Sequence, residues 1–416
     1  MIGAVHQSYC KGVSVHQGFN RAFTLHGTHY LRLERNVAYE VMGHTVFIED
    51  AVETKNYIYQ NLIMKTKRSW SLLNTDQTPA CFWITHPDNN FIENHAAGSD
   101  RYGYWYDLQT HAMGPSASTD ICPENTEVGE FRGNHAHSCG RYGLRIFHNM
   151  VPRKYPCAGI VRDSSNAADP YWRNPPITAT MRDLTSWKNG RNGAIAEKLG
   201  DVRFVGFKTA DNILAGIEVS QSDEYGDDMA QIDGALVVGK SSNTDSTLNA
   251  ASPRGIITPR TENFVVKNVN FFNFDWNEAA ALGSCSHCFS GDATDSGART
   301  VRFSGLQFDS SVTKRIRYQT PHRAIYHDMD GSLTGKGPGS WATPFWLHLD
   351  QPACERLEDV YDGLTCDNSV QVRRVAFHAA DPGHRFQNMG LKILKYDDNI
   401  LAQYRNVTAE YILDKS

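Results

Sequence analysis

Four acidic residues near the ends of strand-like segments have side chains suited to cleaving a glycosidic bond: Glu49, Asp50, Asp107 and Glu130. That reaction needs two carboxyl groups about 5–10 Å apart, one to protonate the leaving oxygen and one to act as nucleophile or base. The alternative is that the carboxylates form surface ion pairs with arginines such as Arg145, which contribute little to stability. We favour ion pairing, and the catalytic interpretation stays open.

Aromatic side chains near these acids would extend such a site. Trp83, Tyr104, Trp105 and Tyr106 have flat, amphipathic rings on which sugars can stack. A groove combining these rings with the acids would bind or cleave a glycan. The sequence therefore predicts either a glycan site here or a row of structural aromatic residues.

A short acidic turn is a candidate cation site. In Asp328-Met-Asp330-Gly, the two carboxylates either cap a turn by accepting backbone hydrogen bonds or hold Ca²⁺, which prefers several oxygen ligands in a glycine-containing loop. We favour the turn. No cofactor is expected, with calcium as the alternative.

Histidine and cysteine supply a second set of candidate ligands. His135-Ala-His137 places two imidazoles on one face of a strand, which favours stacked histidines over a zinc site that still lacks a third ligand. The pair Cys285-x-x-Cys288 similarly favours a local disulfide or two thiols over zinc.

Two further sites point to an oxidising, extracellular setting. Cys354 and Cys366 bracket a short loop, and a disulfide there would stabilise the chain by roughly 3 kcal/mol in the chain-entropy model. Asn406-Val-Thr is a glycosylation sequon, so Asn406 is a candidate glycan attachment site. The chain has 9 cysteines, an odd number that leaves at least one unpaired within the chain.

Short repeated segments indicate the elements that must position these residues. One pattern is Asn-x-Ala, a turn, Gly and then alternating apolar residues; it begins at Asn36, Asn94 and Asn134. A second is a strand that turns a corner, as at Val202-Arg-Phe-Val-Gly-Phe and Val301-Arg-Phe-Ser-Gly-Leu. Both patterns have the period of β-strands, and helical periodicity is almost absent.

Repeats of two or three short strands with Asn or Gly at the corners predict a right-handed parallel β-helix, an all-β solenoid. One coil cannot bury its inward face alone, whereas stacked coils share a continuous core. Asn suits the corners because it tolerates the left-handed conformation and can form side-chain ladders between coils. Segments 69–79, 111–126 and 152–176 are then loops inserted between strands.

Composition excludes several classes of protein. With 41 basic and 46 acidic residues, the net charge of −5 argues against a nucleic-acid partner. A hydrophobic content of 40% excludes a disordered chain. The N-terminus lacks the pattern of a signal peptide, and no run of 18 apolar residues predicts a membrane span, so an extracellular protein of this sequence is expected to be part of a larger one.

Several longer motifs resemble the fibrocystin (polyductin) family, and most closely its fibrocystin-L branch. They are the segments 14–28, 41–50, 78–85, 129–134, 138–143, 323–335, 339–344 and 366–374. The resemblance implies an ectodomain segment of a very large single-pass membrane protein of cilia or other cell surfaces. Related β-helices occur in cell-surface proteins that degrade hyaluronan, but their catalytic residues do not match this chain one by one.

These observations predict β-helix repeats with inserted loops over residues 1–300 and a C-terminal β region, 301–416, that continues the solenoid or packs on it. The expected function is a non-enzymatic extracellular structural and interaction module of a large ciliary or cell-surface membrane glycoprotein. Its expected partners are other cell-surface or ciliary proteins, glycans and the rest of the same polypeptide. The alternative is an enzyme that binds or depolymerises a hyaluronan-type polysaccharide.

Overall fold

The protein is described from a computed structural model. It describes residues 3–4, 8–70, 74–158, 174–222, 230–244, 253–261, 264–276, 279–284, 299–318, 324–344, 352–356 and 363–370. Within these residues no helix is long and apolar enough to cross a membrane.

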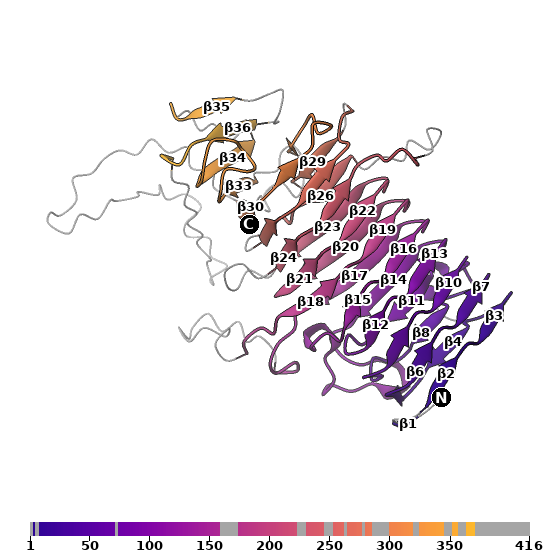
Figure 1. The fold of residues 1–416 in the computed structure, drawn as a ribbon. Coiled ribbons are helices and arrows are strands. Elements are labelled where there is room, and N and C mark those ends of the chain that lie inside the picture. Colours follow the sequence, from indigo (N-terminus) through magenta and orange to yellow (C-terminus); the bar gives the residue numbers. More distant parts are fainter. Residues whose placement is uncertain are drawn as a thin grey trace.

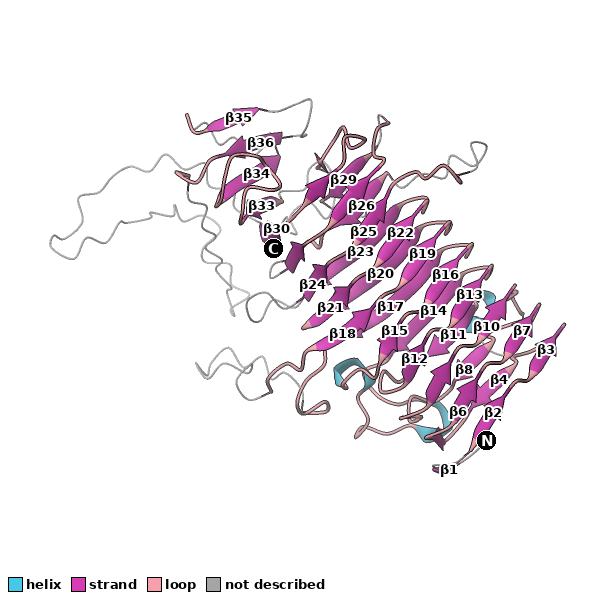
Figure 2. Ribbon diagram, in the orientation of Figure 1, coloured by secondary structure: helices cyan, strands magenta, loops and turns pink. Residues whose placement is uncertain are grey.

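The chain winds into a parallel β-helix whose walls are three long sheets, as the sequence predicts (Figures 1 and 2). The three sheets are called I, II and III, and their strands are given below. Each coil adds one strand to sheet III, then one to sheet I, then one to sheet II. Corresponding strands of successive coils pair in parallel, so equivalent residues form rows along the stack. The coils rise from the indigo N-terminal end to the orange C-terminal end in Figure 1.

Sheets I and II each contain ten strands in the described part of the chain. The strands of sheet I are β3 (Ser14–His16), β7 (Val37–Tyr39), β10 (Leu62–Met64), β13 (His95–Ala97), β16 (His135–His137), β19 (Thr185–Trp187), β22 (Lys208–Ala210), β25 (Leu236–Val238), β28 (Asn270–Phe272) and β31 (Gln307–Phe308). Those of sheet II are β4 (Phe23–Leu25), β8 (Val46–Ile48), β11 (Ala80–Ile84), β14 (Tyr102–Leu108), β17 (Tyr142–Met150), β20 (Asn192–Leu199), β23 (Ala215–Ser222), β26 (Arg254–Ile257), β29 (Ala280–Gly283) and β32 (Ile316–Arg317).

Sheet III changes character at its C-terminal end. Its parallel strands are β2 (Tyr9–Lys11), β6 (Arg32–Glu34), β9 (Tyr57–Tyr59), β12 (Asn90–Ile92), β15 (Phe131–Arg132), β18 (Ala179–Arg182), β21 (Val202–Val205), β24 (Ala230–Asp233), β27 (Phe264–Lys267), β30 (Arg299–Ser304) and β33 (Ile325–Asp328). Three antiparallel strands then extend it: β34 (Ser340–Pro344), β36 (Gly363–Cys366) and β35 (Cys354–Arg356). A separate two-stranded sheet pairs β1 (Gly3–Ala4) with β5 (Thr28–His29).

The solenoid therefore continues past residue 300, and the antiparallel strands pack at its C-terminal end. The disulfide expected between Cys354 and Cys366 joins β35 to β36. Residues 371–416, including the sequon at Asn406, lie outside the described residues, as do Cys285 and Cys288.

Apolar rows fill the interior. Along sheet III, successive strands place a buried residue directly above the one before, in the order Leu33, Ile58, Phe91, Phe131, Met181, Phe204, Ile232, Val266 and Phe303. On sheet I the corresponding row begins with Ala38, Ile63, Ala96 and Ala136, of which all but Ile63 are small. Large and small rows together fill one continuous core.

Asparagine ladders close the corner between sheets III and I. Asn36, Asn61, Asn94 and Asn134 are buried. The side-chain oxygens of the last three each accept hydrogen bonds from the asparagine of the preceding coil, and that of Asn36 accepts from the Val13 amide. The predicted ladder is therefore confirmed. The ladder asparagines themselves do not adopt the left-handed conformation, because positive φ falls on the residue before each of them, namely Arg35, Gln60, Glu93 and Gly133. Two asparagines further along the stack, Asn268 and Asn273, do adopt it.

Inserted loops interrupt the coils on the N-terminal half. Three short 3₁₀ helices occur in the described chain, namely η1 (Asn74–Gln77) before β11, then η2 (Gly114–Ser116) and η3 (Pro123–Asn125) between β14 and β15. The loop of residues 109–126 folds back over coils that precede it in the sequence, because Met113 and Ser116 donate hydrogen bonds to Asp50.

Candidate functional site

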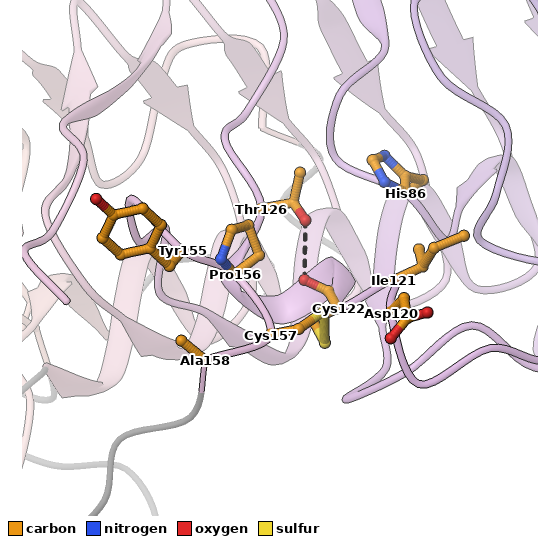
Figure 3. Close-up of a pocket in the computed structure, with 9 residues that line it drawn as sticks. All are labelled: His86, Asp120, Ile121, Cys122, Thr126, Tyr155, Pro156, Cys157 and Ala158. Carbon is orange, nitrogen blue, oxygen red and sulfur yellow. Dashed lines mark hydrogen bonds between the residues drawn. A yellow bond between two sulfur atoms is a disulfide. The ribbon is translucent and has the colours of Figure 1, made fainter.

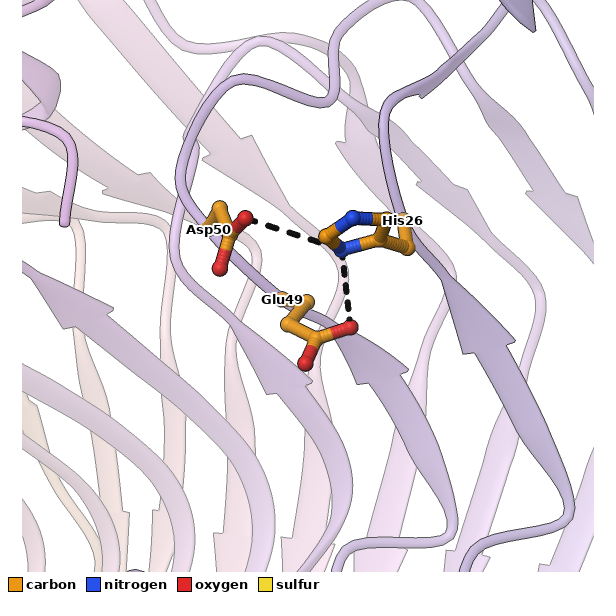
Figure 4. A group of neighbouring side chains, drawn as sticks. All are labelled: His26, Glu49 and Asp50. Atoms are coloured by element: carbon orange, nitrogen blue, oxygen red, sulfur yellow. Dashed lines mark ion pairs between the residues drawn. The ribbon is translucent and has the colours of Figure 1, made fainter. Parts of the chain in front are cut away.

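Three potential ligand side chains meet where two neighbouring coils leave sheet II (Figure 4). His26 follows β4, and Glu49 and Asp50 follow β8; these strands pair in register, so His26 lies beside Glu49. The His26 Nδ1 atom is 3.0 Å from Glu49 Oε2 and 3.5 Å from Asp50 Oδ2. We call these residues the His26 cluster. Two of its members, Glu49 and Asp50, were candidates from sequence, whereas His26 was missed.

The inserted loop covers Asp50. Its side chain is only 5% exposed, and Ser116 Oγ donates a 2.9 Å hydrogen bond to Asp50 Oδ2. Gly114 passes so close that a Cβ added there would lie 2.6 Å from Asp50 Oδ1. A segment two coils further along the stack thus shapes one side of the His26 cluster.

The Glu53 side chain stabilises the turn that carries Glu49 and Asp50. Its fully buried carboxylate accepts hydrogen bonds from the backbone amides of Gly27, Asp50 and Val52. Burial raises its pKa, and the nearby Asp50 charge adds to that effect, although the amide donors oppose it. Ala51, with a positive φ of 68°, then redirects the chain away from the cluster.

Asp107 lies on the same sheet, two coils further on. Phe47, Trp83 and Trp105 are aligned across β8, β11 and β14, and Asp107 stands two residues beyond Trp105, in the row of Glu49. Glu49 and Asp107 are therefore two strand spacings apart, which is about 10 Å. Burial raises the Asp107 pKa, and the nearby His148 charge is the largest opposing influence.

Glu130 is not part of this group. It precedes β15 on sheet III, where its carboxylate pairs with Arg132 at 2.8 Å. Both side chains are well exposed, so the pair contributes little to stability. The prediction that Glu130 acts with the other acids is therefore wrong, because Glu130 lies beside sheet III, whereas the other three lie on or beside sheet II.

The aromatic residues divide between the two faces of sheet II. Tyr104 and Tyr106 point into the core and are completely buried, so the prediction that they stack on sugars is wrong. Trp83 and Trp105 face outward because side chains alternate along a strand. Even there they are only 8% and 5% exposed, and neither presents a free ring face in this structure.

Cations and a histidine cover the outward rings. His44 stacks on Trp83 with ring centroids 4.7 Å apart, and the Arg145 guanidinium lies 4.7 Å from the Trp105 ring centre. Arg21 similarly covers Phe47. These cation–π and stacking contacts stabilise the outer face of sheet II.

His135 and His137 each stack on a ring of a neighbouring coil of sheet I, as favoured from the sequence. The His95 and His135 rings lie 4.3 Å apart and nearly parallel, and His137 stacks on Trp187 at 4.3 Å. Among the described residues, no group with metal-ligand geometry includes these histidines.

The Asp328 turn is held together by its own hydrogen bonds. Buried Asp328 accepts from the amides of Gly331, Leu333 and Thr334, and Asp330 accepts from the amide of Ser332. These contacts are the ones that the turn interpretation requires. Calcium at Asp328 and Asp330 stays a prediction.

A second disulfide joins two inserted loops beside an open pocket (Figure 3). Cys122 and Cys157 are bonded, a pairing that the odd cysteine count could not identify. The pocket has a volume of about 380 Å³. Its lining residues are His86, Asp120, Ile121, Cys122, Thr126, Tyr155, Pro156, Cys157 and Ala158.

His86, at the edge of this pocket, should make the fold sensitive to acid. Burial, helped by the charges of His29 and Lys55, lowers the His86 pKa to about 4. Since the unfolded histidine titrates near 6.5, the stabilisation is complete above that pH and is lost as pH falls towards about 4, by roughly 3 kcal/mol. We expect His86→Asn, which retains an acceptor for the Asp88 amide, to reduce this loss.

Urea unfolding at pH 7 and pH 4.5 measures the effect, with His16→Asn on exposed β3 as the control. An equal loss of stability in wild type and His86→Asn would contradict the assignment.

Several known proteins are similar to this chain in sequence. Residues 1–144 match the family described as CEMIP beta-helix. Fibrocystin-L of mouse is 34% identical over 90% of the chain, and human fibrocystin-L is 33% identical over the same share. Human cell surface hyaluronidase CEMIP2 is 30% identical over 58% of the chain.

The chain spans only 9% of the length of the fibrocystin-L proteins and 20% of CEMIP2. The match to fibrocystin-L nevertheless extends along most of the β-helix, well beyond the part that carries the His26 cluster. The chain therefore belongs to the fibrocystin family of β-helix proteins, and its N-terminal coils are a CEMIP β-helix.

Proposed function

We propose that this chain is a rigid, non-enzymatic extracellular module of a large cell-surface or ciliary membrane glycoprotein of the fibrocystin-L kind. Its role is to hold inserted loops at fixed positions along a stiff solenoid, where other surface proteins or glycans bind them. The loops of residues 109–126 and 150–158, joined by the Cys122–Cys157 disulfide, are the part of that surface best placed for contact.

The observation that carries the proposal is the stack of coils paired along three sheets. The core rows continue along the stack, and an asparagine ladder joins its N-terminal coils. One inserted loop is tied back to an earlier coil by a hydrogen bond, and the Cys122–Cys157 disulfide joins it to the next inserted loop. Such a stack resists bending because every coil contacts its neighbours along three sheets. The similarity to fibrocystin-L along 90% of the chain supports the same role.

The second candidate is an enzyme that binds or depolymerises a hyaluronan-type polysaccharide. It is favoured by the relatives named hyaluronidase and by the row that contains Glu49 and Asp107. A raised pKa suits a proton donor, and Asp107 has one. Against it, the outward tryptophans are covered and Glu130 lies on another wall.

Incubation with high-molecular-weight hyaluronan, chondroitin sulfate and heparan sulfate separates the two candidates. We expect the size distribution of each polymer, measured by size-exclusion chromatography with light scattering, to stay unchanged. The variants Glu49→Gln and Asp107→Asn test the candidate acids, and Glu40→Gln, which removes a surface partner of Lys67 on another wall, is the matched control.

The scaffold proposal would be overturned in favour of the enzyme by one result: wild type and Glu40→Gln fragment a polymer, whereas Glu49→Gln or Asp107→Asn does not.

A further inference from the structure

We propose that the His26 cluster binds one divalent transition-metal ion of the zinc class. The ligands are His26 Nδ1 and one carboxylate oxygen each from Glu49 and Asp50. This site goes beyond the proposed scaffold role and does not depend on it.

The spacing of the donor atoms fits a metal ion. The His26 Nδ1 atom is 3.0 Å from Glu49 Oε2 and 3.5 Å from Asp50 Oδ2, and all three donor atoms lie within 4.8 Å of one another. Metal–ligand bonds of about 2.0–2.2 Å place adjacent donors roughly 3.0–3.5 Å apart. The third pair of donors, the carboxylate oxygens of Glu49 and Asp50, lies within 4.8 Å and would move closer when both bind one ion.

The nitrogen lacks a hydrogen bond. His26 Nδ1 is buried, and within the described chain no contact, including those to Glu49 and Asp50, has hydrogen-bond geometry. A single nitrogen can donate only one proton, yet two carboxylates face it. Coordination to a metal would satisfy the nitrogen lone pair and both carboxylates at once.

Within the described chain, the two carboxylates at the site face no side chain of permanent positive charge, and a protonated His26 would supply only one charge against two. In the described structure, neither Glu49 nor Asp50 has a lysine or arginine within ion-pair distance, and Asp50 is almost fully buried. A buried carboxylate without a cationic partner is costly. A divalent ion would neutralise both carboxylates, and the Ser116 hydroxyl, which donates to Asp50 Oδ2, would orient the same oxygen that faces His26.

The ligand types select the class of ion. Imidazole with two carboxylates suits zinc and its neighbours, whereas calcium and magnesium prefer oxygen ligands alone. About a third of the His26 and Glu49 side chains is exposed, so a water or an external ligand can reach a fourth position. The bound ion would fasten the coil of β4 to the coil of β8 and, through Asp50 and Ser116, to the inserted loop.

Isothermal titration of the metal-free, untagged chain with ZnCl₂ tests the proposal, together with metal content by mass spectrometry. We expect one zinc per chain and a raised Tm. His26→Gln and Glu49→Gln should each weaken binding by more than the roughly 10–100-fold that loss of an outer-shell partner costs. His16→Gln, on exposed β3, should bind as wild type does.

Replacing zinc by cobalt distinguishes this site from thiol sites. The visible spectrum should show ligand-field bands without a sulfur-to-cobalt charge-transfer band, and Glu49→Gln should lose them. Absence of stoichiometric zinc, equal binding by wild type and His26→Gln, or a larger rise in Tm with calcium than with zinc would each overturn the assignment. The metal readouts involve no polysaccharide, so their failure is distinct from failure of the scaffold proposal.

Discussion

Replacing Gly143 with alanine is expected to destabilise the β-helix by about 3 kcal/mol. A Cβ at this position would lie 2.6 Å from the Gly193 carbonyl oxygen and would also collide with the Ser186 hydroxyl. Because the carbonyl belongs to the backbone of the next coil, no side-chain rotation can relieve the contact. Overpacking of this kind typically costs about 1–3 kcal/mol, and we expect the upper end here.

Gly143 belongs to a row of glycines that repeats from coil to coil at the start of the sheet II strands. For Gly103, Gly143, Gly193 and Gly216, an added Cβ would meet the carbonyl oxygen of the next glycine in the row at 2.5–2.7 Å. Because these glycines have no side chain, the inward side chains of sheet I pack directly against the backbone of sheet II. A side chain in the middle of the row would therefore push adjacent coils apart.

Urea unfolding followed by circular dichroism measures the effect of Gly143→Ala. The matched control is Gly18→Ala, whose added Cβ would meet the Val41 side chain at 3.5 Å and the Asn20 carbonyl oxygen at 3.7 Å, both ordinary packing distances. We expect the control to change the free energy of unfolding by less than about 0.5 kcal/mol. A Gly143→Ala variant as stable as the control would show that the coils can separate at this corner without cost.

Replacing Asn61 with alanine should cost roughly 2–5 kcal/mol. Asn61 Oδ1 accepts hydrogen bonds from the backbone and side-chain amides of Asn36, and its Nδ2 donates to the Leu33 carbonyl and to Asn94 Oδ1. Alanine would remove the ladder partner of the Asn36 backbone amide and of the Leu33 carbonyl inside the core. Each buried polar group without a partner costs about 1–3 kcal/mol.

The same unfolding experiment applies, with Asn243→Ala on an exposed turn as the control. The ladder also predicts coupling between coils. The double variant Asn61→Ala, Asn94→Ala should be less destabilised than the sum of the two single variants, because their mutual hydrogen bond is lost only once. Strict additivity would contradict a cooperative ladder.

Local pattern was sufficient to predict the architecture. The Asn-x-Ala repeats place an asparagine at a corner and an inward alanine two residues later, and both features recur in the structure. Strand-like alternation and the absence of helical periodicity follow from the same repeats. The Cys354–Cys366 disulfide was also predictable, because a gap of 12 residues in sequence already brings the two cysteines close together.

Local pattern could not predict which side chains meet. Alternation shows that Tyr104 and Trp105 face opposite sides of a strand, but only the packed sheet reveals which side is the core. The His26 cluster depends on the register between two coils, and its cover depends on a loop that folds back from a third. Aligning His26 with Glu49 at the same position after their strands is the signal that could have revealed the pair.

The sequence by itself therefore determined the parallel β-helix and the asparagine ladder of its N-terminal coils, because short strands with Asn or Gly at the corners repeat along the chain. Its longer motifs, rather than the repeat spacing, carried the resemblance to fibrocystin. Only the tertiary structure decided which acids gather, which aromatic rings are covered and which loop cysteines bond. The physical reason is that these contacts join residues from different coils and loops. Their proximity depends on how the coils stack and where the insertions fold.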